Sequence, residues 1–305
     1  KDMEDVIFNH NVKANWNFHV DWVDVAKINL PKPLSPGQVI LIETPFFVKL
    51  PKVVSRLGHS GKHFEITQWY PKPAVYDNEG WHPMPYLNMG EFYSEFGTFD
   101  VKITLPEDYR IMATGDMINE KEELAWLDSL SSIGDSLKNL TKKELAKHFK
   151  EKKSKSDKKK KSTEKDSLKV YPNKTIHFRQ NNVHDFAWFA DPNWIVQKGE
   201  LWLDDSSKQI ALWSMYLPKN AWMWRKSLDY MHDSGLWYSR FYGDYPYNHI
   251  SAVDGDMSAG GGMEYPNITV ISSSPSEDLL EYVIMHEVGH NWFYGILGTN
   301  ERDHA

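Results

Sequence analysis

Two histidines four residues apart constrain this chain more than any other feature of its sequence. They stand in the run His286-Glu287-Val288-Gly289-His290, which has the pattern H-E-x-x-H. A spacing of four residues places two side chains on one face of an α-helix, about one turn apart. The pattern therefore requires residues 286–290 to lie on a helix, and it makes the two imidazoles a candidate pair of metal ligands.

The flanking residues also predict a helix. The run Ser274-Pro275-Ser276-Glu277 has the form of a capping box, with proline at the first helical position. Apolar residues then dominate from Leu279 to Met285, nearly all round the helix, so we expect the helix to be buried. We predict one continuous α-helix over residues 276–296, with the two imidazole rings facing each other.

Zinc chemistry follows from these residue types. His286 and His290 would each give a neutral ring nitrogen to Zn²⁺, which activates a water and polarises a scissile carbonyl. Glu287 lies roughly 100° around the helix from His286, where it can take the water's proton and pass it to the leaving amine. The alternative is two structural histidines beside a surface glutamate. The longer pattern H-E-x-x-H-x-x-G-x-x-H is excluded, because Phe293 and Ile296 occupy its later positions.

A glycine-rich segment precedes this helix, in the run Ala259-Gly-Gly-Gly-Met-Glu-Tyr-Pro266. Consecutive glycines let another backbone approach closely. The strand expected over residues 267–271 could then pair with an extended substrate by edge addition. Glu264 could hold a free α-amino group by charge-assisted hydrogen bonding. The other interpretation is an ordinary glycine turn before a strand.

Residues 1–120 read as an antiparallel β domain with long loops. Strict alternation predicts a strand over 99–105. After Pro218 the apolar period becomes helical, and a helix is expected over 220–242, ending at Gly243. We therefore predict an α+β fold with a domain boundary near residue 217. Further strand candidates are 20–25, 39–43, 175–179, 200–203 and 209–216.

A lysine-rich insertion interrupts the β pattern at about residues 120–169. Residues 142–169 hold 13 Lys and 5 acidic residues, a local charge of +8. Since the whole chain has a net charge of −7, the rest of the chain has a net charge of −15. We expect one or two short helices over 124–149 and a mobile loop over 150–165, because that run has no apolar side chain to offset its ordering entropy. A basic binding patch is the alternative. The acidic body argues against a nucleic-acid partner.

Composition excludes several other classes. The 305 residues include no Cys, which rules out a disulfide framework, a thiolate zinc site, an iron–sulfur cluster and a Cys nucleophile. No run of 18 apolar residues is present, so we expect no membrane span. The 13 Trp are expected mainly in the core, with an exposed glycan- or peptide-binding surface as the alternative. We favour an extracytoplasmic location, periplasmic or secreted from a bacterium; the oligomeric state is left open.

The two motifs together resemble those of the gluzincin aminopeptidases, the family of aminopeptidase N and leukotriene A hydrolase. That family has Gly-x-Met-Glu-Asn, then H-E-x-x-H, then a Glu roughly 18 residues later. Gly261 to Tyr265 and His286 to His290 carry the likeness here, and the segments 241–247, 67–70 and 74–77 are also similar.

The resemblance implies a fold and a set of site residues. The fold would be a saddle-like, mostly antiparallel β domain over 1–217, followed by the first part of a thermolysin-like catalytic domain over 218–305. The activity would be zinc-dependent removal of N-terminal residues from peptides. The implied roles are zinc ligands at His286 and His290, a general base at Glu287, amino-terminus recognition at Glu264, and substrate contacts at Gly261, Gly262, Met263, Gln68 and Tyr70.

Departures from the family pattern keep alternatives open. Tyr265 replaces the motif's Asn, and Tyr70 stands where relatives have Glu or Gln. Both support a peptide-binding scaffold that does not cleave, and a glycan-binding β module is a third reading. The third zinc ligand and the family's transition-state Tyr would lie past Ala305. We therefore expect these 305 residues to be a fragment that binds its single zinc weakly or not at all and is inactive.

Overall fold

The computed structural model describes residues 2–3, 5–52, 55–86, 90, 92–161, 172–203, 208–257, 260–272 and 274–304, without the side chains of residues 2 and 152–161. The chain divides into two compact units. The first comprises residues 1–51, 69–95 and 298–305, and the second comprises residues 52–68 and 96–297. All of the helices over the described residues belong to the second unit.

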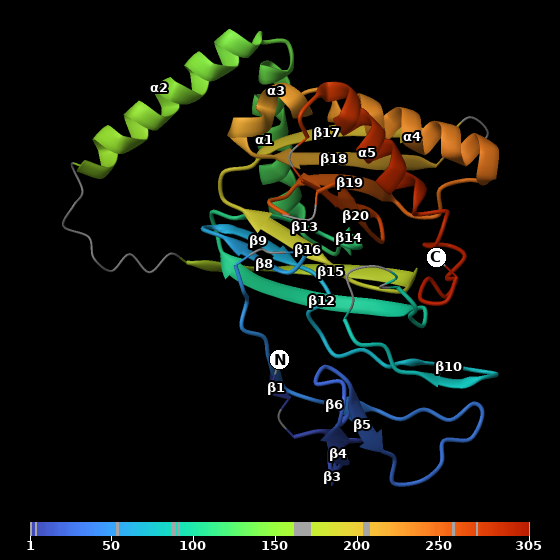
Figure 1. The fold of residues 1–305 in the computed structure, drawn as a ribbon. Helices are drawn as coiled ribbons and strands as arrows, with labels where there is room; N and C mark the ends of the chain where they lie inside the picture. Colours follow the sequence, from blue (N-terminus) through green and yellow to red (C-terminus); the bar gives the residue numbers. More distant parts are fainter. Residues whose placement is uncertain are drawn as a thin grey trace. The chain divides into compact units, whose positions relative to one another are not determined.

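The first unit consists of short antiparallel strand pairs (Figure 1) and contains a small apolar core. Val6, Phe8 and Ala14 form that core, with Trp16 and Ile28 packed against it. The strand predicted over residues 20–25 is wrong: Val20 and Val23 are 89% and 85% exposed, because this segment is the loop between two strands. The strand pairs are β1 (Asp2–Met3) with β7 (Phe46–Phe47), β2 (Ile7–Phe8) with β3 (Val12–Lys13) and β6 (Ile42–Glu43), β4 (Asn15–Phe18) with β5 (Ala26–Asn29), and β10 (Val75–Asp77) with β11 (Gly80–His82).

The second unit contains two antiparallel sheets. The alternation predicted for 99–105 is present in β12, where Phe99, Val101, Ile103 and Leu105 are the more buried residues. One sheet has the order β12 (Gly97–Pro106), β15 (Asn173–Val183), β14 (Asp116–Met117). The other has the order β13 (Arg110–Ala113), β16 (Trp188–Asp191), β9 (His63–Ile66), β8 (Gly58–Ser60).

A five-stranded mixed sheet forms the centre of the second unit. Its order is β17 (Ile195–Trp202), β18 (Gln209–Tyr216), β19 (His249–Asp254), β21 (Ile268–Ile271), β20 (Gly262–Tyr265). Strand β21 pairs with β19 on one side and β20 on the other. The expectation that residues 267–271 offer a free edge is therefore wrong, and the edge strand is β20. The hairpin between them turns at Asn267, which has a left-handed φ of 52°.

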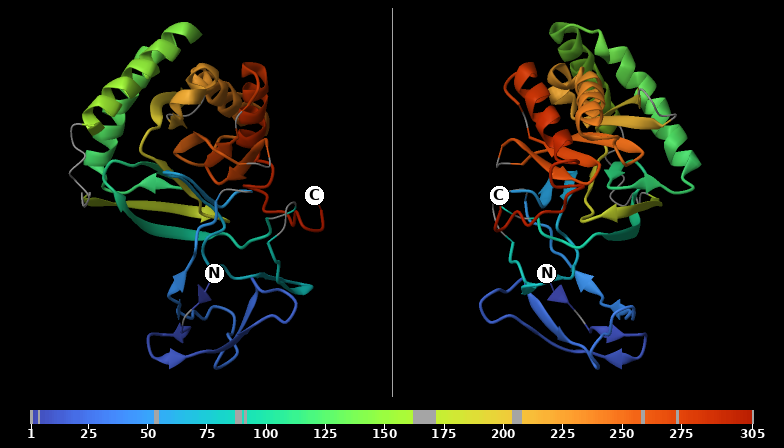
Figure 2. Two further views of the ribbon diagram at one scale, coloured as in Figure 1. Left: turned by 60° about the vertical axis from the view of Figure 1, so that its left-hand side comes forward. Right: turned by 90° about the vertical axis from the view of Figure 1, so that its right-hand side faces the viewer.

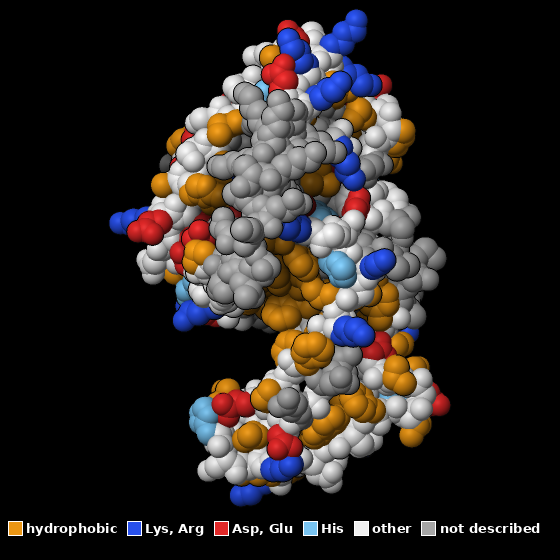
Figure 3. Space-filling view, turned by 90° about the vertical axis from the view of Figure 1, so that its left-hand side faces the viewer, with side chains coloured by type: hydrophobic (Ala, Val, Ile, Leu, Met, Phe, Trp, Pro, Cys, Tyr) orange, Lys and Arg blue, Asp and Glu red, His pale blue; other side chains and the backbone are white. Residues whose placement is uncertain are grey.

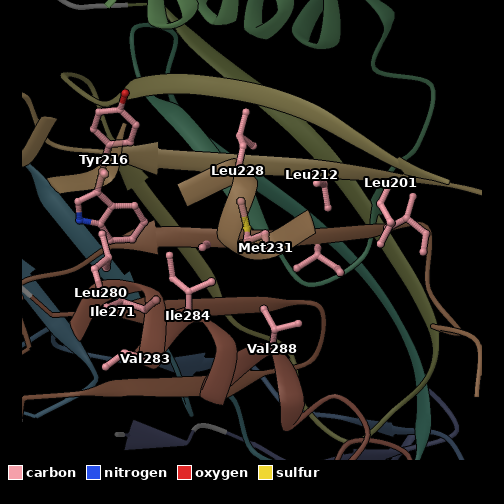
Figure 4. Close-up of a cluster of buried hydrophobic side chains, with 14 of the residues drawn as sticks. Leu201, Leu212, Tyr216, Leu228, Met231, Ile271, Leu280, Val283, Ile284 and Val288 are labelled. Carbon is pink, nitrogen blue, oxygen red and sulfur yellow. The ribbon is translucent and has the colours of Figure 1, made fainter. Parts of the chain in front are cut away.

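Helices α4 (Ser227–Tyr242) and α5 (Glu277–Gly289) cover one face of this sheet (Figure 2). Figure 4 shows side chains from α4, α5 and the strands meeting in the main apolar core, among them Met231, Leu212, Ile271 and Ile284. The helix predicted over 220–242 is present as η1 (Pro218–Asn220), α3 (Ala221–Trp224) and α4, and it ends at Gly243 as expected.

The lysine-rich insertion forms two helices, α1 (Lys121–Lys138) and α2 (Lys142–Lys161). Helix α1 packs against β17: a Cβ on Gly134 would lie 2.1 Å from the Val196 carbonyl oxygen, and the amide of Lys198 donates to Ser131. Residues 150–161 continue α2, so the expectation of a loop is wrong for that stretch. The remainder of the predicted mobile segment, 162–165, lies outside the described residues.

The fold is α+β with mostly antiparallel sheets. Residue 217 lies within the second unit, directly after β18, and the division of the chain there stays a prediction, as does a saddle shape for the N-terminal part. No helix over the described residues has both the length and the apolar character to cross a bilayer. On the face drawn in Figure 3, described acidic and basic side chains lie among apolar and uncharged ones.

Candidate metal and peptide site

Helix α5 carries the histidine motif, and its beginning differs from the sequence prediction. Ser276 is the N-cap, and its hydroxyl accepts the amide of Leu279 at 3.2 Å. The expected cap at Ser274 and the helical start at Pro275 are wrong by two residues. Arg225 lies 2.6 Å from Glu277 in the first turn, an ion pair that attaches this end of the helix to the segment between α3 and α4. Negative charge in the first turn also suits the helix dipole.

The helix ends sooner than predicted, at Gly289, and His290 is its C-cap. Residues 290–297 continue as turns, so one helix over 276–296 is wrong. Beyond Gly289 the backbone bonds tighten to turns: the Asn291 amide donates to the Val288 carbonyl at 3.1 Å and the Trp292 amide to the Gly289 carbonyl at 2.9 Å. Tyr294, with a φ of 102°, ends this run of turns.

The helix is also buried on one face only. Leu280, Ile284 and Val288 are inside, whereas Tyr282 is 58% exposed and His286 is also exposed. The expectation of a fully buried helix is therefore wrong for the described chain.

The two imidazoles nevertheless face each other. Their Nε2 atoms lie 3.2 Å apart, and the ring centroids are 4.7 Å apart with the planes at 90°. The Nδ1 of His290 lies 3.0 Å from the Phe293 carbonyl oxygen, to which it can only donate. That hydrogen bond fixes the tautomer and leaves the Nε2 lone pair directed toward His286.

These nitrogens fit a zinc ion. Two ligands at about 2.0–2.1 Å from a tetrahedral zinc are themselves about 3.3 Å apart, close to the 3.2 Å between the Nε2 atoms. A metal ligand must be the neutral imidazole. Burial, together with the charge on His290, lowers the pKa of His286 and favours that form.

Glu287 is the buried member of the motif. It is 5% exposed, and its Oε2 has no hydrogen-bond partner among the described residues. Burial, reinforced by the charge of Glu264, raises its pKa to about 8. Its side chain lies against Gly262, where an added Cβ would be 2.5 Å from Glu287 Cγ. A nearby cation would favour the ionised form that accepts a proton.

Glu264 comes from edge strand β20. Its side chain is 15% exposed, and its Oε1 lies 4.0 Å from the Nε2 of His290. One donor atom from each of Glu264, Glu287 and His290 lies within 4.8 Å of the other two. Three acidic or imidazole groups from two elements therefore converge beside His286.

The other sequence candidates are placed differently. Gly261 has a φ of 70°, and its carbonyl accepts both the amide and the hydroxyl of Ser272. The Met263 side chain is buried, and its sulfur accepts a hydrogen bond from Arg56 Nε at 2.8 Å. Gln68 has a left-handed φ of 46° in the second unit. Tyr70 belongs to the first unit. The substrate roles of all four stay predictions.

Two features of the site have no signal in the sequence motifs. Tyr265 is 1% exposed and packs near Phe189, so this departure from the family pattern points into the core. A Cβ on Gly262 would displace Glu287, which spacing alone does not reveal. The alternation of β20, with Met263 and Tyr265 inside, could have indicated the burial of Tyr265.

Comparison with known structures gives a fold class. The fold resembles part of the M1 zinc metallopeptidases, over most of this chain. No protein-family model and no curated protein matches the chain.

Two solved structures illustrate the likeness. An M1 zinc metallopeptidase from Deinococcus radiodurans matches with a TM-score of 0.53 at 14% identity, over 98% of this chain and 56% of its own. Legionella pneumophila aminopeptidase A, in complex with aspartic acid, matches with a TM-score of 0.58 at 13% identity, over 95% of this chain and 29% of its own. The chain thus spans about half the length of the first structure and less than a third of the second.

Proposed function

We propose that this chain carries the zinc-binding and proton-transfer residues of a metallopeptidase that removes N-terminal residues from peptides. The observation that carries the proposal is the pair of Nε2 atoms 3.2 Å apart on α5 with a buried carboxylate between them in sequence. His286 and His290 would hold one Zn²⁺. When bound, that ion supplies a Lewis acid for the scissile carbonyl and lowers the pKa of a water.

Glu287 has the position and environment of a general base. As a carboxylate it accepts the proton of the attacking water, a C–O bond forms at the scissile carbonyl, and the C–N bond breaks as the same proton passes to the leaving amine. Its packing against Gly262 holds the side chain in one place, which keeps the proton acceptor oriented during this transfer.

Strand β20 has the properties of a peptide-docking edge. Over the described residues it pairs on one side only, with β21, so an extended peptide can add to its other side. Glu264 projects from this strand, is mostly buried and is near His290. A carboxylate there would bind a protonated α-amino group, and that charge pairing favours exopeptidase action at the N-terminus.

The fold neighbours support a peptide ligand. A variant of the Deinococcus radiodurans metallopeptidase binds a Tyr-Ser-Ala substrate, with a TM-score of 0.52 at 14% identity. Likeness at this identity concerns the fold, so for this chain the substrate class rests on the site geometry.

Zinc binding and hydrolysis test the proposal separately. Zinc affinity of the whole protein should fall by at least about 100-fold in His286→Ala and in His290→Ala, and should be unchanged in His232→Ala, a half-buried histidine on α4. The full-length protein should hydrolyse aminoacyl amides, and Glu287→Gln should abolish this while zinc stays bound. Zinc binding that ignores both histidines would refute the proposal.

The same assays separate the alternatives. A non-cleaving scaffold would bind a free-amino peptide without hydrolysing it. The glycan-binding reading requires several exposed Trp in one patch. Three of the 13 Trp are exposed, Trp81 in the first unit, Trp202 on β17 and Trp237 on α4 of the second, and glycan binding to the whole protein tests this alternative. The extracytoplasmic location, the third zinc ligand and the inactivity of an isolated 305-residue chain stay predictions.

A further inference from the structure

A buried charged cluster lies outside the proposed site, between two sheets of the second unit. His63 and Glu65 on β9 and Asp191 on β16 are each at most 3% exposed. The Nε2 of His63 lies 3.1 Å from Glu65 Oε1, and its Nδ1 lies 3.3 Å from Asp191 Oδ2. Burial alone would lower the pKa of His63, but the two carboxylates outweigh it and raise that pKa to about 9. The imidazole is therefore a cation held between two carboxylates.

Glu65 extends this cluster to the connection between β19 and β20. Its Oε1 accepts the amide of Asp256 at 2.5 Å. Gly255 lies directly against it, since an added Cβ would be 2.8 Å from Glu65 Oε1 and 2.4 Å from Val270 Cγ2. One carboxylate oxygen thus bonds to His63 on its own strand and to the backbone that leaves β19.

The backbone that leaves β19 is connected to the proposed site through strand β21. Ile271 on β21 is the Cα partner of Asp254 on β19 and also of Gly262 on β20. The Gly255 amide donates to the Ile271 carbonyl at 2.9 Å. Ser272, which follows Ile271 in the chain, donates its amide to the Gly261 carbonyl at 3.0 Å. Both ends of the β19–β20 connection are therefore attached to consecutive residues, Ile271 at the end of β21 and Ser272 directly after it.

The position of Gly262 matters because there is no space for a Cβ between it and the Glu287 side chain. Displacement of this end of β20 would therefore change the contact that the proposed general base makes. The same strand carries Glu264 two residues later. A group that fixes the start of the connection would fix both.

We propose that Glu65 is a positioning residue for this site: its carboxylate, oriented by His63, anchors Gly255 and Asp256 and through Ile271 and Ser272 sets the position of Gly262 against Glu287. The inference rests on the proposed peptidase function for its consequence in catalysis. Its structural content is independent of any activity.

Amide hydrogen exchange of the whole protein tests this directly. In Glu65→Ala the amides of Asp256 and Ser272 should exchange at least tenfold faster, because the acceptor that orders the connection is gone. Glu65→Gln keeps a carbonyl acceptor for the Asp256 amide and should restore protection to near the wild-type level. Asp191→Asn is the matched control: it removes the other carboxylate of His63 and should leave the Ser272 amide unchanged.

The exchange and activity results distinguish failure of the Glu65 inference from failure of the proposed peptidase function. If Glu65→Ala exposes only the Asp256 amide and leaves Ser272 protected, or if Asp191→Asn exposes Ser272 equally, the inference is overturned. In the full-length protein, Glu65→Ala should lower kcat for aminoacyl-amide hydrolysis at least tenfold, with Asp191→Asn near wild type. A wild-type protein that binds zinc but hydrolyses nothing contradicts the proposed function, and the exchange result still decides the role of Glu65.

Discussion

Gly262 and Glu287 are in such close contact that a side chain at position 262 would require Glu287 to move. A Cβ there would lie 2.5 Å from Glu287 Cγ and 2.6 Å from both Cδ and Oε1. These two residues come from the two motifs that the sequence analysis treated separately. Their contact is the physical link between the edge strand that would hold a peptide and the carboxylate that would move its proton.

Gly262→Ala should therefore displace Glu287 rather than simply strain the strand. We expect a loss of stability of about 1–3 kcal/mol from overpacking and a fall in kcat of at least tenfold. Zinc affinity should stay near wild type, because the three atoms nearest to an added Cβ all belong to Glu287 and none to His286 or His290. Urea unfolding, zinc titration and steady-state kinetics of the full-length protein measure the three quantities.

The control is Gly97→Ala on β12, where an added Cβ meets no atom within 4 Å. It should change neither stability nor kcat appreciably. An active Gly262→Ala variant with normal kcat would show that the Glu287 position is not set by this contact.

Ser276→Ala should destabilise α5, whereas the stability of Ser274→Ala should stay close to that of the wild type. The Ser276 hydroxyl accepts the Leu279 amide, and loss of such a cap costs about 0.5–2 kcal/mol. Equilibrium urea unfolding of the two single variants compares them on the same chain. Equal costs, or a larger cost at Ser274, would mean that the helix begins where the sequence pattern placed it.

Helix α5 shows which features could be predicted from the sequence and which could not. The local signals were sufficient for the helix itself, because spacing lies within one element. They predicted burial nearly all round it, whereas only the face with Leu280, Ile284 and Val288 is buried. They were not sufficient for the choice between two serines two residues apart, since both satisfy the same pattern. The early end at Gly289 depends on backbone hydrogen bonds of residues 291–295, which no apolar period encodes.

Long-range pairing was the other limit. Residues 262–265 and 268–271 both resemble strands, and sequence cannot say which lies at the edge, because this depends on the parallel partner β19. Likewise Glu65 and Asp256 are 191 residues apart, and nothing near either residue predicts their hydrogen bond. The residue types of the candidate site were readable from its motifs, whereas the contacts that position them were not.

Stability should depend on pH through His63. Its folded-state pKa of about 9 lies above the ordinary value of 6.5, so its contribution is fully present below pH 6.5 and is lost as pH rises through about 9. The contribution is on the order of 3 kcal/mol. The free energy of unfolding of wild type and His63→Gln, measured by urea below pH 6.5 and above pH 9, should differ most at the lower pH. A gap that stays constant or widens with pH would show that His63 is not the cation of this cluster.

Glu264→Gln should separate recognition of the substrate's amino group from binding of the metal. The neutral amide loses the charge that would pair with a protonated α-amine, so KM for aminoacyl amides should rise about tenfold with a smaller change in kcat. N-acetylated analogues, which lack that charge, should be poor substrates of wild type and variant alike.

Because Glu264 also lies within 4.8 Å of His290 and Glu287, it could instead be a metal ligand, and zinc affinity decides this. Unchanged zinc affinity with raised KM supports the amino-group role, with Glu281→Gln on the exposed face of α5 as the control. A large loss of zinc affinity with an unchanged KM in the metal-saturated protein would assign Glu264 to the metal and remove the argument for exopeptidase action.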